Sequence, residues 1–261
     1  MSHLTTGPLL GFDTETTGVN PFQDRIVTAA LVGRGPNGTE QRTWLIDPGV
    51  EIPEQAAAIH GVDTEHARAH GMQPAQALAE IAAELTAAFK HQIPVVAFNA
   101  AFDLTIIERE LERHGLTTIG ERLGAPLAPV VDPLVLDRAL DRYRPGKRKL
   151  VDLCEVYGVA DAGQLHTADV DVAATLDVLA KQAQRHPELS AQDLDQLHLW
   201  QAGQHRAWAT GFNQWRQSKG LTGPGASLDW PLAREQEPAE PDTAPFEAAG
   251  SAPGAQPQRV A

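Results

Sequence analysis

The sequence predicts an α/β fold in which a mixed five-stranded sheet is flanked by helices and followed by a C-terminal helical extension. Three observations support this prediction. Short apolar runs separated by turn residues come first, apolar residues then recur at helical spacing, and further short apolar runs alternate with the helical segments. Strands that form a meander and then alternate with helices are typical of a mixed sheet with helices on its faces.

The first three strands are expected to form an antiparallel meander. They are the apolar run 9–12, the β-branched run 26–32 and the run 43–46, which ends at Asp47-Pro48-Gly49. Gly35-Pro36-Asn37-Gly38 separates the second run from the third and is typical of a hairpin turn.

Helices and strands are expected to alternate after this meander. Residues 94–98 and 130–131 are short apolar runs that indicate buried strands. Helical spacing predicts helices at 74–89, 104–114, 134–140, 150–157 and 168–184, and a last one at about 190–218. Five residues of the last helix are spaced as one apolar stripe: Leu194, Leu197, Trp200, Trp208 and Trp215.

Composition divides the chain into three parts. Residues 1–187 are expected to form the main domain and 188–219 a helical extension. Residues 220–261 are rich in Pro, Ala and Glu, so a mostly disordered tail is expected there, with 228–232 as a candidate docking patch.

Composition also limits the class of protein. No apolar run reaches membrane-spanning length and no secretory signal is visible, so no membrane partner is expected. Cys154 is the only cysteine, which fits a reducing cytoplasm. The net charge of −13 argues against binding nucleic acid by bulk electrostatics, but it is compatible with an enzyme that holds only a strand end. The oligomeric state is left open.

Two acidic residues follow the first expected strand. Asp13 and Glu15 are two positions apart, so on an extended backbone their side chains point to the same side. Carboxylates this close repel each other unless a cation lies between them. Oxygen ligands without a cysteine cluster favour Mg²⁺ or Mn²⁺. On its own, an Asp-x-Glu pair is more often an exposed strand end.

The other candidates also have plain structural explanations. Asn99 or Asp103 can cap the helix that follows them. Asp171 is favoured near a helix N-terminus by the helix dipole, and a loop histidine such as His166 is usually a surface residue. Taken together, four carboxylates and one imidazole are the groups needed to hold two divalent metals and to activate a water against a phosphodiester.

These segments, in this order, resemble the motifs of the DEDDh, or DnaQ-like, 3′→5′ exonucleases over about residues 8–185. The three motifs are Phe12-Asp13-Thr14-Glu15-Thr16-Thr17-Gly18, Asn99-Ala100-Ala101-Phe102-Asp103 and His166-Thr167-Ala168-Asp169-Val170-Asp171. Ile59-His60-Gly61-Val62 and Leu150-Val151-Asp152-Leu153-Cys154 are similar to two further segments of that family.

The resemblance implies a ribonuclease H-like sheet and a role for each matched residue. Asp13, Glu15 and Asp171 would bind two divalent ions, Mg²⁺ or Mn²⁺, and Asp103 would complete the site through water. His166 would deprotonate the attacking water. The terminal nucleotide would be contacted by Thr14, Thr16, His60, Asn99 and Phe102. Gln55 stands where many relatives have a glutamate, which leaves recognition of the 3′-hydroxyl open.

A basic stretch surrounds the Pro145-Gly146 turn. Charge runs are usually solvated loops, but beside a strand-binding site this one is expected to contact backbone phosphates. The candidates for these contacts are Arg144, Lys147, Arg148 and Lys149.

The function expected from the sequence is a metal-dependent 3′→5′ exonuclease that releases nucleoside 5′-monophosphates from single-stranded DNA ends, in repair or proofreading. One alternative is an RNA-trimming exonuclease of the same family, since the motifs do not decide the sugar preference. Another is an accessory subunit that docks on a polymerase or repair complex through the Trp-bearing helix and tail, residues 188–261.

Overall fold

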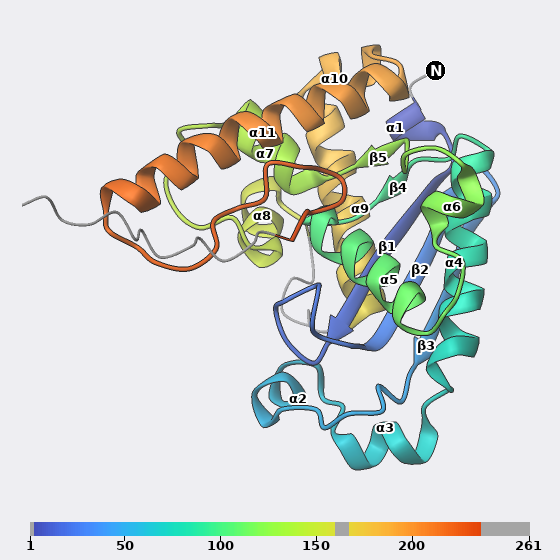
Figure 1. Cartoon of the computed structure of the whole chain (residues 1–261). Helices are drawn as coiled ribbons and strands as arrows, with labels where there is room; N and C mark the ends of the chain where they lie inside the picture. Colours follow the sequence, from blue (N-terminus) through green and yellow to red (C-terminus); the bar gives the residue numbers. More distant parts are fainter. Residues whose placement is uncertain (1–2, 160–166, 236–261) are drawn as a thin grey trace, which may run out of the picture.

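The fold centres on one mixed sheet, seen in a computed structural model that describes residues 3–159 and 167–235. The strands lie in the order β3-β2-β1-β4-β5 (Figure 1). They are β1 (Leu9–Thr16), β2 (Ile26–Gly35), β3 (Gly38–Leu45), β4 (Val95–Val96) and β5 (Val130–Val131). The first three pair antiparallel, and β4 pairs parallel with both β1 and β5. The predicted five-stranded mixed sheet is therefore confirmed.

The β2–β3 hairpin turns at the predicted place. Gly35 pairs with Gly38, so Pro36 and Asn37 form the turn. Strand β3 begins five residues before the predicted start at 43. Its first six residues are exposed at the edge of the sheet, so they carry no apolar pattern that the sequence could have revealed.

Eleven helices are described. They are α1 (His3–Thr6), α2 (Glu54–His60), α3 (Thr64–His70), α4 (Pro74–Lys90), α5 (Ala100–Arg113), α6 (Ile119–Leu123), α7 (Pro133–Leu140), α8 (Leu150–Tyr157), α9 (Ala168–Arg185), α10 (Pro187–Ala191) and α11 (Leu194–Ser218). All predicted helices are present within a few residues of their predicted ends. The unpredicted ones, α1, α2, α3, α6 and α10, have seven residues or fewer, too few to show a helical period.

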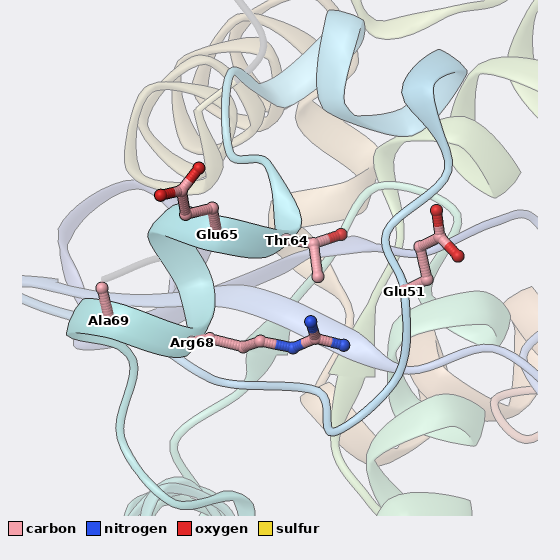
Figure 2. Close-up of a pocket in the computed structure, with 5 residues that line it drawn as sticks. All are labelled: Glu51, Thr64, Glu65, Arg68 and Ala69. Atoms are coloured by element: carbon pink, nitrogen blue, oxygen red, sulfur yellow. The ribbon is translucent and has the colours of Figure 1, made fainter.

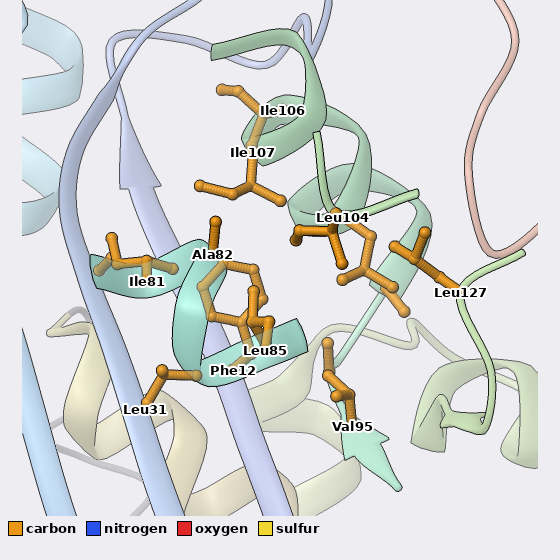
Figure 3. Packing of buried hydrophobic residues seen from close by; sticks show 14 of the residues in the cluster. Phe12, Leu31, Ile81, Ala82, Leu85, Val95, Leu104, Ile106, Ile107 and Leu127 are labelled. Atoms are coloured by element: carbon orange, nitrogen blue, oxygen red, sulfur yellow. The ribbon is translucent and has the colours of Figure 1, made fainter. Parts of the chain in front are cut away.

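One face of the sheet packs against α4 and α5. Phe12 of β1 and Leu31 of β2 meet Ile81 of α4 and Leu104 of α5 in the larger apolar core (Figure 3). These side chains are almost completely buried. Because side chains alternate along a strand, the neighbouring residues point to the other face.

The opposite face of the sheet packs against α9. Val32, Val96 and Leu176 belong to a second buried core on that side. Strand β1 approaches α9 most closely at Gly11, where an added Cβ would lie 2.3 Å from Cγ1 of Val172. Since Gly11 has no side chain, the strand and the helix can touch, and this contact fixes their separation.

Helix α11 covers the edge strand β5 and packs against α7 (Figure 1). The Val130 amide donates to Nδ1 of His198 at 3.2 Å, and Nε2 of Gln201 donates to the Val130 carbonyl at 3.0 Å. The Asp132 amide donates to Oε1 of Gln201 at 2.8 Å. An edge strand leaves backbone groups without a partner strand, and the two side chains of α11 provide these bonds instead.

The buried face of α11 differs from the predicted apolar stripe. Leu197, Gln201, His205 and Ala209 are buried at successive four-residue steps, whereas half of Trp215 is exposed. The prediction of a single apolar stripe through Trp215 is therefore wrong. Gln201 is buried because the edge of β5 needs hydrogen-bond partners, and His205 is buried where its Nε2 pairs with the Ser227 carbonyl at 3.0 Å.

Residues 226–234 fold back onto the molecule after α11. Trp230 is buried in the larger core, and its ring lies 5.0 Å from that of His198. The Ala233 amide donates to Oγ1 of Thr105 at 2.8 Å. The candidate docking patch 228–232 thus packs on its own chain. Residues 236–261 lie outside the described residues, and the division of the chain at 187 and 219 stays a prediction.

Two further observations bear on the class of protein. Among the described residues, the helices are too short or too polar to cross a bilayer. Cys154 is buried on α8 as a free thiol.

Candidate metal and nucleotide site

Three carboxylates from two elements meet at one end of β1. Asp13 and Glu15 lie on β1 and Asp171 lies in the first turn of α9. One oxygen of each lies within 4.8 Å of the others. The pleat of β1 explains this convergence, because Gly11, Asp13 and Glu15 share the side that faces α9. The structure brings together the three residues that were expected to bind metal.

Burial and mutual repulsion weaken the acidity of this cluster. Burial, followed by the charges of Asp103, Asp171 and Glu15, raises the pKa of Asp13 well above its usual value. Burial and the charge of Asp171 raise the pKa of Glu15 to about 7. A cation among these oxygens would remove the repulsion. An all-carboxylate donor set without sulfur suits a hard divalent ion such as Mg²⁺ or Mn²⁺.

Asp103 stands beside the cluster on α5 and is almost completely buried. Its Oδ1 accepts hydrogen bonds from the Thr14 amide at 3.0 Å and the Thr14 hydroxyl at 2.7 Å. Burial raises the pKa of Asp103 to about 7, although the bonds from Thr14 act in the opposite direction. Thr14 points to the α5 face of the sheet while its neighbours Asp13 and Glu15 point to α9, so all four carboxylates gather around one strand end.

The turn into α5 is held by a residue that sequence reasoning did not assign to the site. Asn99 begins the helix with a φ of 62°, and its side chain forms no capping bond. Instead the buried carboxylate of Asp132 accepts from the amides of Asn99 at 3.1 Å and Ala100 at 2.9 Å. It also accepts from the Leu134 amide at 2.9 Å. Asp132 therefore joins the starts of α5 and α7. Asp132-Pro133 was a visible signal, because aspartate before a first-turn proline is a common helix start.

A pocket of about 400 Å³ opens beside Asp13. Its lining combines carboxylates, apolar side chains and cations: Asp13, Thr14, Phe98, Asn99, Phe102, Asp103, Leu134, Arg138, Arg148, Lys149 and Leu150. Such a lining suits a ligand with an apolar ring and an anionic group. The predicted residues Thr14, Asn99 and Phe102 are here. Phe98, Leu134, Arg138 and Leu150 were not predicted as site residues, although Leu134 and Arg138 are spaced to share one helix face.

Two other predicted nucleotide contacts lie outside this lining. The Thr16 hydroxyl donates to the Gly18 carbonyl at 2.6 Å. His60 is buried at the end of α2, where its Nδ1 accepts from the Val62 amide at 3.2 Å. Burial lowers the pKa of His60, while the backbone of Thr16 raises it, so the two residues are neighbours. Their contact with a nucleotide stays a prediction.

The basic stretch is partly engaged inside the protein. Asp137 is fully buried and binds Arg144 at 2.9 Å and Arg148 through the same oxygen, Oδ2. Tyr157 donates to its other oxygen at 3.1 Å. Lys147 is exposed, whereas Arg148 and Lys149 line the pocket. The phosphate contacts expected of these four residues stay predictions. The predicted base, His166, lies outside the described residues, and its role also stays a prediction.

A second pocket, of about 680 Å³, lies on α3 and the loop before α2. Figure 2 shows Thr64, Glu65, Arg68 and Ala69 on α3, with Glu51 facing them from the loop. This pocket shares no residue with the acidic cluster. Among the described residues, the carboxylates that converge are Asp13, Glu15 and Asp171, not those of this pocket. The cluster at Asp13 is therefore the candidate site.

Curated proteins of the DNA polymerase III PolC type match the main part of the chain. DNA polymerase III PolC-type from Streptococcus thermophilus is 33% identical over 166 residues, which are 63% of this chain and 10% of that protein. The PolC-type enzyme of Lacticaseibacillus paracasei is 27% identical over 173 residues, 66% of this chain and 11% of its own length. The chain thus spans about a tenth of the length of the curated relatives it matches.

Solved structures show the same fold. A structure of exonuclease I superimposes with a TM-score of 0.60 at 22% identity, over 70% of this chain and 42% of that one. Escherichia coli exonuclease I in complex with a dA16 oligonucleotide gives a TM-score of 0.61 at 21% identity, over 76% and 43%. The ribonuclease H-like sheet implied by the motifs is confirmed. The exonuclease family model matches residues 10–179, and the chain therefore belongs to the exonuclease family.

Proposed function

We propose that this chain is a metal-dependent 3′→5′ exonuclease that releases nucleoside 5′-monophosphates from single-stranded DNA. The observation that carries the proposal is the convergence of Asp13, Glu15 and Asp171 within 4.8 Å. This cluster borders a pocket that also holds aromatic and cationic side chains. Membership of the exonuclease family supports the reaction class.

The carboxylate cluster would hold two divalent ions, Mg²⁺ or Mn²⁺. When bound, these ions would supply positive charge that stabilises the attacking and leaving oxygens of an in-line displacement. Asp13, Glu15 and Asp171 would hold the ions, and Asp103 would complete the site through water, as the resemblance to DEDDh exonucleases implies. His166 would accept the proton of the attacking water, as the resemblance to DEDDh exonucleases implies.

The pocket would hold the last nucleotide of the strand. Phe98, Phe102 and Leu150 would contact its sugar and base, because apolar side chains suit the faces of these rings. Lys149 and Arg148 would lie near its phosphates. The names of the relatives favour DNA over RNA, since they are DNA polymerases and an exonuclease crystallised with deoxyadenosine oligonucleotide.

The PolC relatives also favour one partner class. They carry the matched stretch within a DNA polymerase III, so we propose that this chain acts beside a DNA polymerase. We also propose that it acts in a reducing cytoplasm, where the free thiol of Cys154 is stable. Primer extension by the host's replicative polymerase, with and without this chain, would then show faster removal of a mismatched 3′ nucleotide. An unchanged removal rate contradicts the partnership and leaves the nuclease proposal intact.

The direct test is a product assay on labelled single strands of DNA and RNA with matched sequence. The expected result is release of 5′-mononucleotides from the 3′ end, faster for DNA, dependent on Mg²⁺ or Mn²⁺ and stopped by a chelator. Asp171→Asn should abolish release. Asp177→Asn is the matched control, because Asp177 lies on the same helix in an exposed ion pair with Arg34. Equal activity of Asp171→Asn and the wild type would contradict the site.

A further inference from the structure

Arg138, on α7, differs from Arg144 and Arg148 in its partners. Arg144 and Arg148 share one ion-pair partner, Asp137, whereas within residues 3–159 and 167–235 no ion pair joins Arg138 to a carboxylate. Burial lowers its pKa only to about 10, so its guanidinium stays protonated at neutral pH. It lines the pocket beside Asp13 and at the same time lies over the ring of Trp208, with Cζ 3.5 Å from the ring centroid.

A row of aromatic rings runs along α11 from this point. The ring centroids of Trp208 and Phe212 lie 5.4 Å apart, with 15° between the ring planes. The centroids of Phe212 and Trp215 lie 5.8 Å apart, with 27° between the planes. We call Trp208, Phe212 and Trp215 the aromatic ladder. It spans about 10 Å of helix, at 1.5 Å per residue. Half of Trp215 is exposed at its far end, and the Arg216 guanidinium lies over Phe212 at 5.9 Å.

The ladder is not explained by packing of the core. The buried residues of α11 are Leu197, His198, Gln201, His205 and Ala209. The ladder lies on α11, outside the stretch 10–179 that matches the exonuclease family. One guanidinium, that of Arg138, lies over its first ring, Trp208, and another, that of Arg216, lies over its middle ring, Phe212. Arg216 also donates to the Thr222 carbonyl at 2.7 Å.

The ladder begins where the pocket ends. A strand whose last nucleotide occupies the pocket must leave it with the preceding phosphates and bases still attached. Arg138 is the residue that the pocket and the ladder share. Aromatic faces that stack bases, flanked by arginines that meet phosphates, are the combination by which proteins hold single strands without reading their sequence.

We propose that Arg138 and the aromatic ladder bind the single strand upstream of its 3′-terminal nucleotide, with Arg138 on a phosphate and Trp215 stacked on a base. This inference rests on the proposed exonuclease function. Stacking on one aromatic ring is worth about tenfold or more in affinity. The ladder would therefore make longer strands better substrates than ones that only fill the pocket.

The test compares substrates of different length on the full chain. Thymidine 5′-monophosphate p-nitrophenyl ester fills only the pocket, whereas oligothymidylates of two and eight nucleotides differ in their reach along the ladder. For the wild type we expect kcat/KM to rise with length. The length gain is the ratio of kcat/KM for the octamer to kcat/KM for the dimer. Trp215→Ala should lower this gain by about tenfold, and Trp215→Phe should keep most of it.

Two further variants complete the design. Leu199→Ala is the matched control, because Leu199 is an exposed apolar residue on the same helix, and the length gain should not change. Arg138→Gln should reduce the slope of log Kd against log salt for the octamer, measured in chelator, by about one. Melting temperatures of all variants exclude unfolding as the cause.

The outcomes separate the two proposals. If the wild type hydrolyses neither the ester nor the oligomers with metal present, the exonuclease function is wrong. If it hydrolyses both but Trp215→Ala keeps the full gain with length, the nuclease assignment stands and the ladder proposal is overturned. The same conclusion follows if Leu199→Ala and Trp215→Ala lose the gain equally.

Discussion

Thr14 donates two hydrogen bonds to a single oxygen of Asp103, from its amide at 3.0 Å and from its hydroxyl at 2.7 Å. This pair ties β1 to α5 within the site. Because Asp13 and Glu15 flank Thr14 in the chain, the bond also fixes the strand that presents their carboxylates. The Thr14 side chain is therefore expected to matter for both the geometry and the acidity of the cluster.

Thr14→Val keeps the shape of the side chain but removes the hydroxyl donor. The bond from Thr14 lowers the pKa of Asp103, so its loss should raise that pKa and move the rising limb of the pH–activity profile upward. We expect about tenfold lower kcat at neutral pH and a loss of about 1 kcal/mol in unfolding free energy. Thr14→Ser should restore both. A wild-type pH profile for Thr14→Val would contradict the prediction.

The metal-free protein should lose stability as the pH rises. Glu15 and Asp103 have pKa values of about 7 in the folded chain, against the usual values of 4.5 for glutamate and 3.8 for aspartate. Between about pH 4 and pH 7 the unfolded chain therefore releases protons that the folded chain retains. The unfolding free energy falls with pH in that window.

Divalent metal should reverse this loss. Ligand carboxylates must be deprotonated to bind it, so the increase in melting temperature on adding Mn²⁺ should be larger at pH 8 than at pH 5. Scanning calorimetry at both pH values measures it, with Asp171→Asn as the variant that should show little increase. The same increase at both pH values would argue that the metal binds elsewhere.

The hydrogen bonds of Gln201 to β5 and to Asp132 should stabilise the folded chain. Gln201→Leu leaves the Val130 carbonyl and the Asp132 amide without their partners, and each buried unsatisfied group costs about 1–3 kcal/mol. We expect a total loss of about 3 kcal/mol by urea unfolding. Gln196→Leu, on the exposed side of the same helix, should change little. Equal stability of the two variants would show that α11 does not support β5.

Asp137 tests whether Arg144 and Arg148 are structural. Asp137→Asn leaves two largely buried guanidiniums without a counter-charge, which should cost about 3 kcal/mol of unfolding free energy. Asp141→Asn is a suitable control, since Arg148 reaches Asp141 only through its backbone carbonyl. If Asp137→Asn is as stable as the wild type, the ion pairs of Asp137 with Arg144 and Arg148 do not stabilise the fold.

The sequence predicted what depends on local pattern. The strand that presents Asp13 and Glu15 and the first turn of α9 with Asp171 are each visible within a few residues, as is the hairpin at Gly35. Their convergence was inferred from a family resemblance rather than from any single motif. Short helices such as α2 were missed because seven residues contain too little of the apolar period.

Contacts between distant residues could not be predicted in the same way. That Asp132 rather than Asn99 caps α5 depends on two helices starting side by side. That α11 buries Gln201 rather than Trp215 depends on an edge strand whose unpaired backbone lies beneath it. In both cases the hydrogen-bond partner is a backbone group far away in the chain, and the spacing of apolar residues does not indicate such a partner.

The contact of Gly11 with Val172 has a consequence for the newly made chain. Asp13 leaves the ribosome before Asp171 does, because the helix that carries Asp171 is translated only near the end of the domain. A nascent chain in which α9 has not yet packed on β1 has Asp13 and Glu15 in place but lacks Asp171, so its carboxylate cluster is incomplete. Synthesis itself would thus delay hydrolysis, so unfinished chains would not degrade nucleic acid around the ribosome.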